Sequence, residues 1–360
     1  MIFAPRHMML IVLASTTAAL SQSPLPPDAA VRAALDQHPH VEAALARVAA
    51  AKAHQRGLKA GPHELTVTGT YIRRSIDRDG KYDEYDAMVM RGIRLPQKAR
   101  LDNVAGEQGV IAAENLAEDA RHQAATALNE LWWDWLAASR EAEVDAASVR
   151  NHQAMLAALQ RRLALKDAAA LDVDQTAAAL ADAQTTWAQS QGQVSLARAH
   201  LATQFPGLPL PAQAPLIPLP DIAMGRLEEM ARQVIDRSHD IAAANAETEQ
   251  PQALAQRAKA DRIADPNLGV RLFSERNGAE RGAGVVMSIP LGIGARKAGA
   301  DKAAADAKAA NAELAAVRMS VEELATTNLA DVRAKLSAWQ FANAAADSQQ
   351  AALARIKRGQ

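Results

Sequence analysis

The amino-acid sequence predicts a mainly α-helical protein that carries two β-hairpins, and three observations lead to this fold class. Aromatic residues make up only 3% of the chain while alanine recurs throughout, which suits long helices packed closely side by side. Small and apolar residues follow one another at spacings of three and four over long stretches without proline. The order helix, hairpin, helix also occurs twice, with matching positions offset by 200, 198, 196 and 194 residues.

Four pairs of landmarks trace this repeat: Val41 with Ile241, Asp79-Gly80 with Asn277-Gly278, Arg100 with Arg296, and Leu159 with Leu353. We therefore divide the chain into a first repeat (24–205), a proline-rich linker (206–220) and a second repeat (221–360). In the first repeat 46 residues separate Leu159 from Phe205, whereas only 7 follow Leu353. We expect the second repeat to lack its last helix, roughly 40 residues that a complete copy would contain.

The N-terminus has the pattern of a secretory signal peptide over residues 1–21. Arg6 and His7 precede an apolar run, Met8–Leu20, and small residues follow. A membrane anchor is the alternative, but these 13 apolar residues are fewer than the roughly 20 that a helical span needs. We therefore expect export.

The elements of both repeats can be placed from breakers and periodicity. In the first repeat we expect helices at 28–38, 39–60, 97–166 and 172–205, and strands at 64–75 and 83–93. In the second we expect helices at 221–238 and 239–263, strands at 267–276 and 281–291, and a final long helix. A helix of about 70 residues is roughly 100 Å long, far longer than a globular domain requires. Paired as antiparallel hairpins, such helices would form coiled-coil seams.

The seam of the first long helix is expected at Val110, Ala113, Ala117, Ala120, Ala124, Ala127 and Leu131. The seam of the last is expected at Ala303, Ala307, Ala310, Leu314, Val317, Val321 and Leu324. Trp132, Trp133 and Trp135 are expected to pack on a neighbouring helix rather than to form an interfacial aromatic belt.

Both hairpins alternate apolar and polar residues with a period of two, over about the length at which a tilted strand crosses a bilayer. The positions expected to face lipid are Leu65, Val67, Tyr71, Tyr85, Val270, Leu272, Val285 and Met287. Tyr71, Tyr82 and Tyr85 are candidates for an aromatic belt. The alternative is a hairpin that caps a coiled coil in water. Because open strand edges leave backbone groups unpaired in lipid, several chains would have to pool their strands, and three would supply twelve.

The first half carries the short motifs His38-Pro39-His40-Val41, Leu95-Pro96-Gln97-Lys98-Ala99-Arg100 and Arg161-Arg162-Leu163 with Asp167–Val173, and the second half supplies Ser288-Ile289-Pro290-Leu291 before Gly299. With them the chain resembles the outer-membrane efflux family of TolC, and within it the CzcC-like heavy-metal-efflux group. The resemblance implies a TolC-like fold: a homotrimer with four transmembrane β-strands per protomer in a β-barrel, and an α-barrel of helical hairpins that crosses the periplasm.

The resemblance also implies partners and a function. The helical tip would dock a periplasmic adaptor protein, which joins an inner-membrane pump, through Arg162, Leu163, Lys166, Asp167, Leu171 and Asp172. Family members often have glycine at the position of Lys166, so this tip is expected to turn differently. Asp167 and Asp172 also suit helix capping, and the alternative for all tip charges is a solvated helix end. The chain would be a passive exit duct for metal cations in the outer membrane; a channel for organic compounds and a pore-free periplasmic adaptor or scaffold are the alternatives.

The sequence points away from other function classes. A formal net charge of −1 offers no basic field for nucleic acid, and the absence of cysteine excludes thiolate chemistry. No nucleotide fingerprint or catalytic triad order occurs, so we expect no enzyme activity and no cofactor. His38 and His40 are expected to point apart at a helix break rather than to bind metal. His63 and the other single histidines are expected to be solvated.

Overall fold

The computed structural model describes residues 25–220 and 223–359 of the chain. The predicted signal peptide, residues 1–21, lies outside this range. Two compact units can be separated by their internal contacts. The smaller contains the described residues up to Ala34 together with Leu128–Leu219, and the larger contains Leu35–Ala127 together with Pro220 onward. Each unit is described below by itself.

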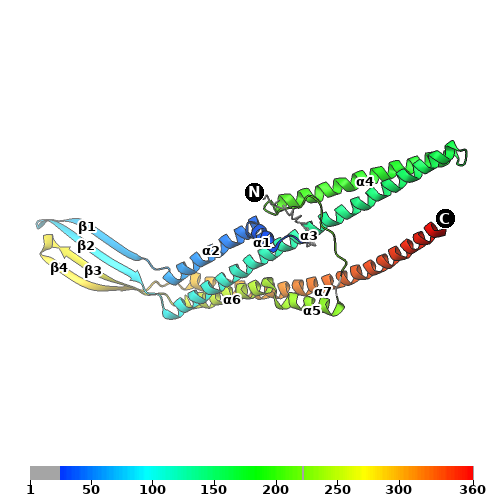
Figure 1. Cartoon of the computed structure of the whole chain (residues 1–360). Helices are drawn as coiled ribbons and strands as arrows, with labels where there is room; N and C mark the ends of the chain where they lie inside the picture. Colours follow the sequence, from blue (N-terminus) through cyan, green and yellow to red (C-terminus); the bar gives the residue numbers. More distant parts are fainter. Residues whose placement is uncertain (1–24, 221–222, 360) are drawn as a thin grey trace, which may run out of the picture. The chain divides into compact units, whose positions relative to one another are not determined.

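The larger unit contains a four-stranded antiparallel sheet in the order β1-β2-β3-β4. Its strands are β1 (Leu65–Ile76), β2 (Gly80–Gly92), β3 (Asn267–Glu275) and β4 (Glu280–Ser288). Pairing of β2 with β3 joins the two hairpins, which are far apart in the sequence, into one sheet (Figure 1). The predicted fold class, mainly helical with four strands, is confirmed.

Positive backbone φ angles explain the hairpin turns. Gly80 closes the first turn at φ 120°, and Asn277 and Gly278 close the second at 55° and 90°. Asparagine and glycine tolerate this left-handed region better than other residues. The second turn forms a short 3-10 helix, η1 (Arg276–Gly278), before β4 begins. The turn chemistry read from the sequence therefore sets where each strand reverses.

The helices of the larger unit are α2 (Pro39–Ala60), the first part of α3 (Pro96–Ala164), α5 (Met224–Asp236), α6 (His239–Ala260) and α7 (Ile293–Gly359). Ala44 and Val48 of α2 pack against Ala117 of α3 in an apolar cluster. Figure 1 shows α6 lying along α7, and there the Thr248 hydroxyl donates to the Ala310 carbonyl at 3.2 Å. Small side chains allow this close approach, as the alanine-rich composition predicts.

The smaller unit pairs the remainder of α3 with α4 (Ala170–Gln204), and α1 (Asp28–Asp36) begins in it. Trp132 and Trp135 are each 2% exposed, and their rings meet edge to face with centroids 5.3 Å apart. The Arg198 guanidinium of α4 lies 5.2 Å from the centre of the Trp135 ring. The predicted packing on a neighbouring helix is therefore confirmed for Trp135, whereas Trp132 is buried beside it next to Pro209 and Pro211 of the linker.

Two predicted seams shift by one residue towards the C-terminus. In α3 the predicted Ala127 is exposed, and Leu128 is buried in its place. In α7 Leu324 is 54% exposed, whereas Ala325 is 6% exposed. A straight helix has 3.6 residues per turn, so its buried stripe drifts away from a strict heptad after a few turns.

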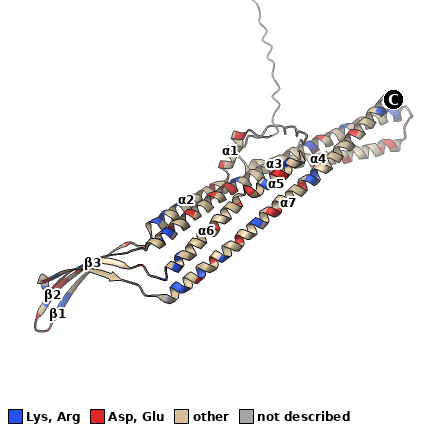
Figure 2. Cartoon of the chain, turned by 90° about the horizontal axis from the view of Figure 1, so that it is seen from below, with Lys and Arg blue, Asp and Glu red and all other residues tan. Residues whose placement is uncertain are grey.

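Charge runs along the whole length of the helices. Figure 2 shows acidic and basic residues interspersed along α2, α3, α6 and α7. None of the described helices has an apolar stretch long enough to act as a membrane span.

Candidate functional site

Strand register places one set of apolar side chains on a single face of the sheet, which we call the apolar face. Its four rows, read across β1 to β4, are Leu65–Arg91–Leu268–Met287, Val67–Val89–Val270–Val285, Gly69–Ala87–Leu272–Ala283 and Tyr71–Tyr85–Ser274–Arg281. All eight residues predicted to face lipid lie in these rows. These eight side chains are exposed, from 53% for Val270 to 83% for Val285. The structure thus brings together, from two distant hairpins, a continuous apolar surface.

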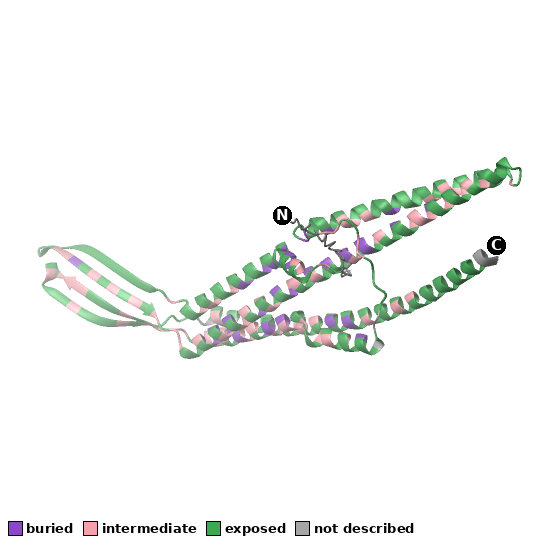
Figure 3. Cartoon of the chain, viewed as in Figure 1, coloured by how far each residue is buried: buried purple, intermediate pink, exposed green. Residues whose placement is uncertain are grey.

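The other side of the sheet, the polar face, carries Thr66, Thr68 and Thr70 on β1 and the ion pair of Asp86 with Arg271 between β2 and β3. Met88, Met90 and Phe273 on this face are half-buried, whereas their neighbours in sequence on the apolar face are exposed. This alternation is visible along the strands in Figure 3.

Charges near the hairpin turns are also sorted by face. Beyond the row of Tyr71 and Tyr85, which we call the tyrosine row, the apolar face carries Arg73, Lys81 and Asp83, and Arg281 lies within that row. On the polar face the corresponding residues are Arg74, Glu84, Glu275 and Glu280. For these strand residues the formal charges add to +2 on the apolar face and −2 on the polar face; the sum leaves out Asp77, Arg78, Asp79 and Arg276 of the turns, of which Arg276 pairs with Glu280.

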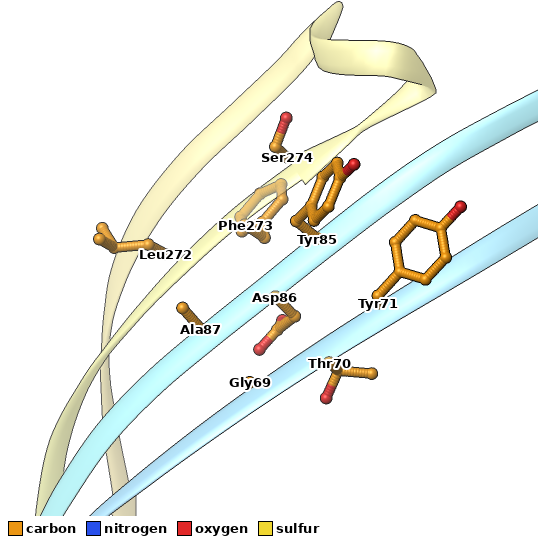
Figure 4. Close-up of a pocket in the computed structure, with 9 residues that line it drawn as sticks. All are labelled: Gly69, Thr70, Tyr71, Tyr85, Asp86, Ala87, Leu272, Phe273 and Ser274. Atoms are coloured by element: carbon orange, nitrogen blue, oxygen red, sulfur yellow. The ribbon is translucent and has the colours of Figure 1, made fainter.

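The tyrosine row borders a shallow groove of about 520 Å³ on the apolar face. Tyr71 and Tyr85 stand side by side with ring centroids 5.3 Å apart, and Gly69 and Ala87 leave the neighbouring row low (Figure 4). The Tyr71 hydroxyl donates to Asp83 at 2.7 Å. Tyr82, the third tyrosine predicted for a belt, projects from the polar face and donates to the Asp79 carbonyl, so it does not belong to this row.

A network of buried charges holds the base of the sheet, where strands meet helices. Lys98 of α3 is 1% exposed. Its ammonium group contacts Asp265 at 2.8 Å and Asp261 at 3.0 Å, and it donates to the Ile263 carbonyl at 2.7 Å. Both carboxylates belong to the second repeat, so this lysine ties the two repeats together.

Asp102 extends the network to two arginines. Its carboxylate accepts hydrogen bonds from Arg94 at 2.9 Å and from Arg257 at 2.8 Å. Arg94 also donates to the carbonyls of Leu58 and Lys59 at the end of α2. We call Arg94, Lys98, Asp102, Arg257, Asp261 and Asp265, with His63, the junction network. Its three cations and three carboxylates balance, as buried charges require.

His63 was expected to be solvated, and this expectation is wrong. Its Nε2 lies 2.9 Å from Asp265 Oδ2. Burial by itself would raise the pKa of Asp265, but hydrogen bonds from Lys98, from His63 and from the Leu95 N–H outweigh it and hold the pKa at about 2. Reasoning from the sequence does not find this network, because Lys98 follows the first hairpin and Asp265 precedes the second, far away in the chain.

The helical tip is the turn between α3 and α4, and all six residues predicted for docking are exposed there. Lys166 adopts φ 62°. Its N–H donates to the Leu163 carbonyl and the Asp167 N–H donates to the Arg162 carbonyl, which together form a Schellman motif with lysine at the position that glycine favours. The Arg162 guanidinium closes the turn by donating to the Asp167 carboxylate at 3.0 Å.

Of the two carboxylates predicted to cap a helix at the tip, Asp172 caps α4 and Asp167 does not. Asp167 pairs with Arg162 rather than capping α4. Asp172 is the third helical residue, and its carboxylate accepts the Ala169 N–H at 3.3 Å, because α4 begins two residues earlier than expected. Leu165 and Leu171 are 79% and 63% exposed beside these charges.

The two N-terminal histidines also depart from expectation. His38 and His40 do not point apart; their rings stack with centroids 5.3 Å apart. Burial and the neighbouring His40 lower the pKa of His38. Within the described residues no group of three histidine or acidic side chains is arranged to hold a metal ion.

Comparison with known proteins gives the fold its context. No protein-family model and no curated protein matches the sequence. Solved structures do match, and outer-membrane channels are among them. The outer-membrane channel OprN superposes with a TM-score of 0.68 at 21% identity, covering 86% of this chain and 74% of its own. CusC gives 0.65 at 16% identity, covering 91% and 79%.

The outer membrane protein VceC of Vibrio cholerae gives a TM-score of 0.63 at 19% identity, covering 81% of this chain and 75% of its own. At such identities the likeness establishes the fold. The chain therefore has the TolC-like fold of outer-membrane channels.

Proposed function

We propose that this chain is the outer-membrane channel subunit of a tripartite, RND-type efflux system. In this role it is a passive exit duct that works as a homotrimer with a periplasmic adaptor and an inner-membrane pump. It lies in the outer membrane and its helices extend into the periplasm. The observation that carries the proposal is the apolar face, a surface of exposed aliphatic residues assembled from two hairpins 200 residues apart in sequence.

The dimensions of this face fit an outer membrane. From Leu65 to Tyr71 the chain advances six residues, about 20 Å at 3.3 Å per residue. Ile93 and Ile289, 45% and 51% exposed, extend the apolar surface towards the helices. The outward apolar band of outer-membrane barrels is about 25 Å tall, with aromatic residues at its border. In water such an exposed apolar surface would promote aggregation, whereas in a membrane lipid chains would cover it.

The edges of the sheet favour an oligomer. β1 and β4 are edge strands, so one side of each lacks a partner strand within the chain. Unpaired backbone groups in lipid cost several kcal/mol each, which pairing with a neighbouring copy removes. Three copies of a four-stranded sheet would supply twelve strands, an even number within the range of outer-membrane barrels. The apolar face then points to lipid and the polar face lines the lumen.

Adaptor docking is assigned in this proposal to the helical tip. Arg162, Lys166, Asp167 and Asp172 surround the exposed Leu163 and Leu171, a mixed charged and apolar surface on a turn fixed by the Schellman motif. Such pre-organisation lowers the entropy cost of binding. The substrate is assigned as metal cations, supported by the excess of carboxylates on the polar face near the turns, which would line the exit of the lumen.

Membrane insertion tests the channel proposal. Purified full-length protein reconstituted in a planar bilayer is expected to give discrete conductance steps, and native mass spectrometry in detergent is expected to give a trimer. Val285→Arg puts a charge on the apolar face and should abolish insertion, whereas Gly284→Arg on the polar face should preserve it. Recovery of the wild type as a soluble periplasmic monomer would support the pore-free adaptor or scaffold and refute the channel.

Docking and substrate have separate tests. Leu171→Asp should abolish efflux in cells while conductance of the purified protein is unchanged, and Leu196→Asp, an exposed leucine on α4 away from the tip, serves as the control. Replacing Glu275 and Glu280 by glutamine should lower the cation-to-anion permeability ratio of the pore. An unchanged ratio would contradict the assignment of cations and favour organic compounds.

A further inference from the structure

The groove on the apolar face has a chemical character that membrane insertion alone does not require. Its floor is the row Gly69–Ala87–Leu272–Ala283, in which three of the four side chains are a hydrogen or a methyl group. The rows on either side are the four valines and the tyrosine row. The result is a trough across the strands, bordered on one side by Tyr71 and Tyr85 (Figure 4).

Polar groups gather on the turn side of this trough. Hydroxyl groups of Tyr71, Tyr85 and Ser274 and the guanidinium of Arg281 lie in the row immediately above it. Arg73 and Lys81 follow on the same face, one and two rows farther along β1 and β2, at about 6.6 Å per row. Asp83, the acidic residue among them, accepts the Tyr71 hydroxyl.

Along the apolar face an apolar trough is followed by a row of hydroxyl groups and then by cations. An anionic lipid has the same order of groups: an acyl chain, a polar ester and glycerol region, and a phosphate. We infer that the apolar face carries a specific site for a phosphorylated lipid, with one acyl chain in the trough and the headgroup phosphate at Arg281, Arg73 and Lys81. The inference rests on the proposed function, since it needs the apolar face to meet lipid. Strands in such barrels tilt by about 35–45°, so a trough across them is inclined to the membrane plane and can receive a descending chain.

Charge sorting is the observation that selects a lipid phosphate as the occupant. If the charges near the turns served only solubility, both faces would carry the same balance. Instead the net formal charge is +2 on the lipid-side face and −2 on the other, although the residues alternate along the same strands. A lipid phosphate at the membrane interface would contact the apolar face, which carries the positive charge. Each basic residue near the phosphate strengthens lipid binding about fivefold.

The test uses full-length protein in a neutral detergent, with native mass spectrometry to measure binding of phosphatidylglycerol and of phosphatidylcholine. We expect phosphatidylglycerol to bind at least tenfold more tightly. Substituting Arg73, Lys81 and Arg281 by glutamine together should remove this preference. The matched control substitutes three exposed lysines of α7, Lys297, Lys302 and Lys308, by glutamine and should retain it, although the net charge changes equally.

The trough is tested independently of charge. A Cβ added at Gly69 or at Gly284 meets no atom within 4 Å, so both positions accept leucine without a clash. Gly69→Leu fills the trough and should weaken binding of both lipids about tenfold, whereas Gly284→Leu, on the polar face, should leave both unchanged. Conductance measured on each variant verifies that the sheet has assembled.

Three results would overturn the inference. Equal affinity of the wild type for the two lipids would show a non-specific annulus. Complete displacement of phosphatidylglycerol by millimolar inorganic phosphate would show an anion site without a role for the trough. Equal effects of Gly69→Leu and Gly284→Leu would show that neither face is selective. If the wild type conducts and one of these results is found, only the lipid site fails; if it neither inserts nor conducts, the proposed function fails and the lipid site with it.

Discussion

The two ends of α3 carry similar residues in opposite environments. At its start, Lys98 is 1% exposed and is surrounded by carboxylates and carbonyl oxygens of the second repeat. At its end, the side chains of Arg162 and Asp167 are 56% and 72% exposed and pair within one turn of chain. The contrast teaches that charge density along a helix does not reveal where charge stabilises the fold.

The physical reason is the difference in solvation. A buried ion has lost its water, so removal of one partner leaves the other charge uncompensated at a cost of several kcal/mol. An exposed pair exchanges its partner for water at little cost, typically 0–1 kcal/mol. We therefore expect mutations at the junction network to affect stability strongly and mutations at the helical tip to affect it weakly.

The largest expected effect is that of Lys98→Met, which keeps the length of the side chain and removes the charge. Asp261 and Asp265 would then lose the cation that both carboxylates contact. The free energy of unfolding should therefore fall by about 3–5 kcal/mol. Denaturant unfolding of the purified protein measures it. Lys302→Met, at an exposed lysine of α7, should change stability by less than about 0.5 kcal/mol. Equal effects of the two would refute the contrast between the two ends of α3.

Acid should weaken the same network. The pKa of Asp265 is depressed to about 2, so its contribution is complete above the pKa of the unfolded chain, near 4, and is lost as the pH falls towards 2. The loss amounts to about 2 kcal/mol, since one pKa unit corresponds to about 1.4 kcal/mol. Unfolding midpoints at pH 5 and pH 2.5 measure it. Asp265→Asn should be less stable than the wild type at pH 5, and the difference should shrink at pH 2.5; a constant difference would show that the carboxylate charge is irrelevant.

At the helical tip, Lys166→Gly should stabilise the protein by about 0.5–1 kcal/mol. A residue with a Cβ is destabilised by about 1–2 kcal/mol in the left-handed region, and glycine removes this strain. Glycine also raises the conformational entropy of the unfolded chain, which offsets part of the stabilisation. Thermal unfolding of the variant, compared with Lys166→Ala, separates backbone strain from charge. Alanine keeps the Cβ and should give no gain, so stabilisation by both would assign the effect to the lysine charge.

Arg162→Gln should have the smallest effect, no more than about 0.5 kcal/mol, because its pair with Asp167 is solvated. The same variant should weaken adaptor binding in a pull-down if the tip docks as proposed. Loss of more than about 2 kcal/mol would show that the tip, like the junction network, depends on its charges to fold.

Local patterns were sufficient to place the elements and the apolar face. Alternation predicted Leu65, Val67 and Tyr71 on one face, and the register confirms it across all four strands. Patterns failed where partners lie far apart in sequence. His63 meets Asp265 across 202 residues, and Lys98 meets the Ile263 carbonyl across 165, and no local signal reports such pairs. The heptad prediction also failed after about five turns, since the true period is 3.6 residues per turn.

The sequence by itself determined the helices, their breaks, the two hairpins and which side of each strand is apolar, because these depend on neighbouring residues and their backbone preferences. Only the tertiary structure decided that β2 pairs with β3, that His63 meets Asp265 and that Lys98 is buried. These features depend on groups that approach one another after the chain has folded, where the loss of water makes each contact strong or costly.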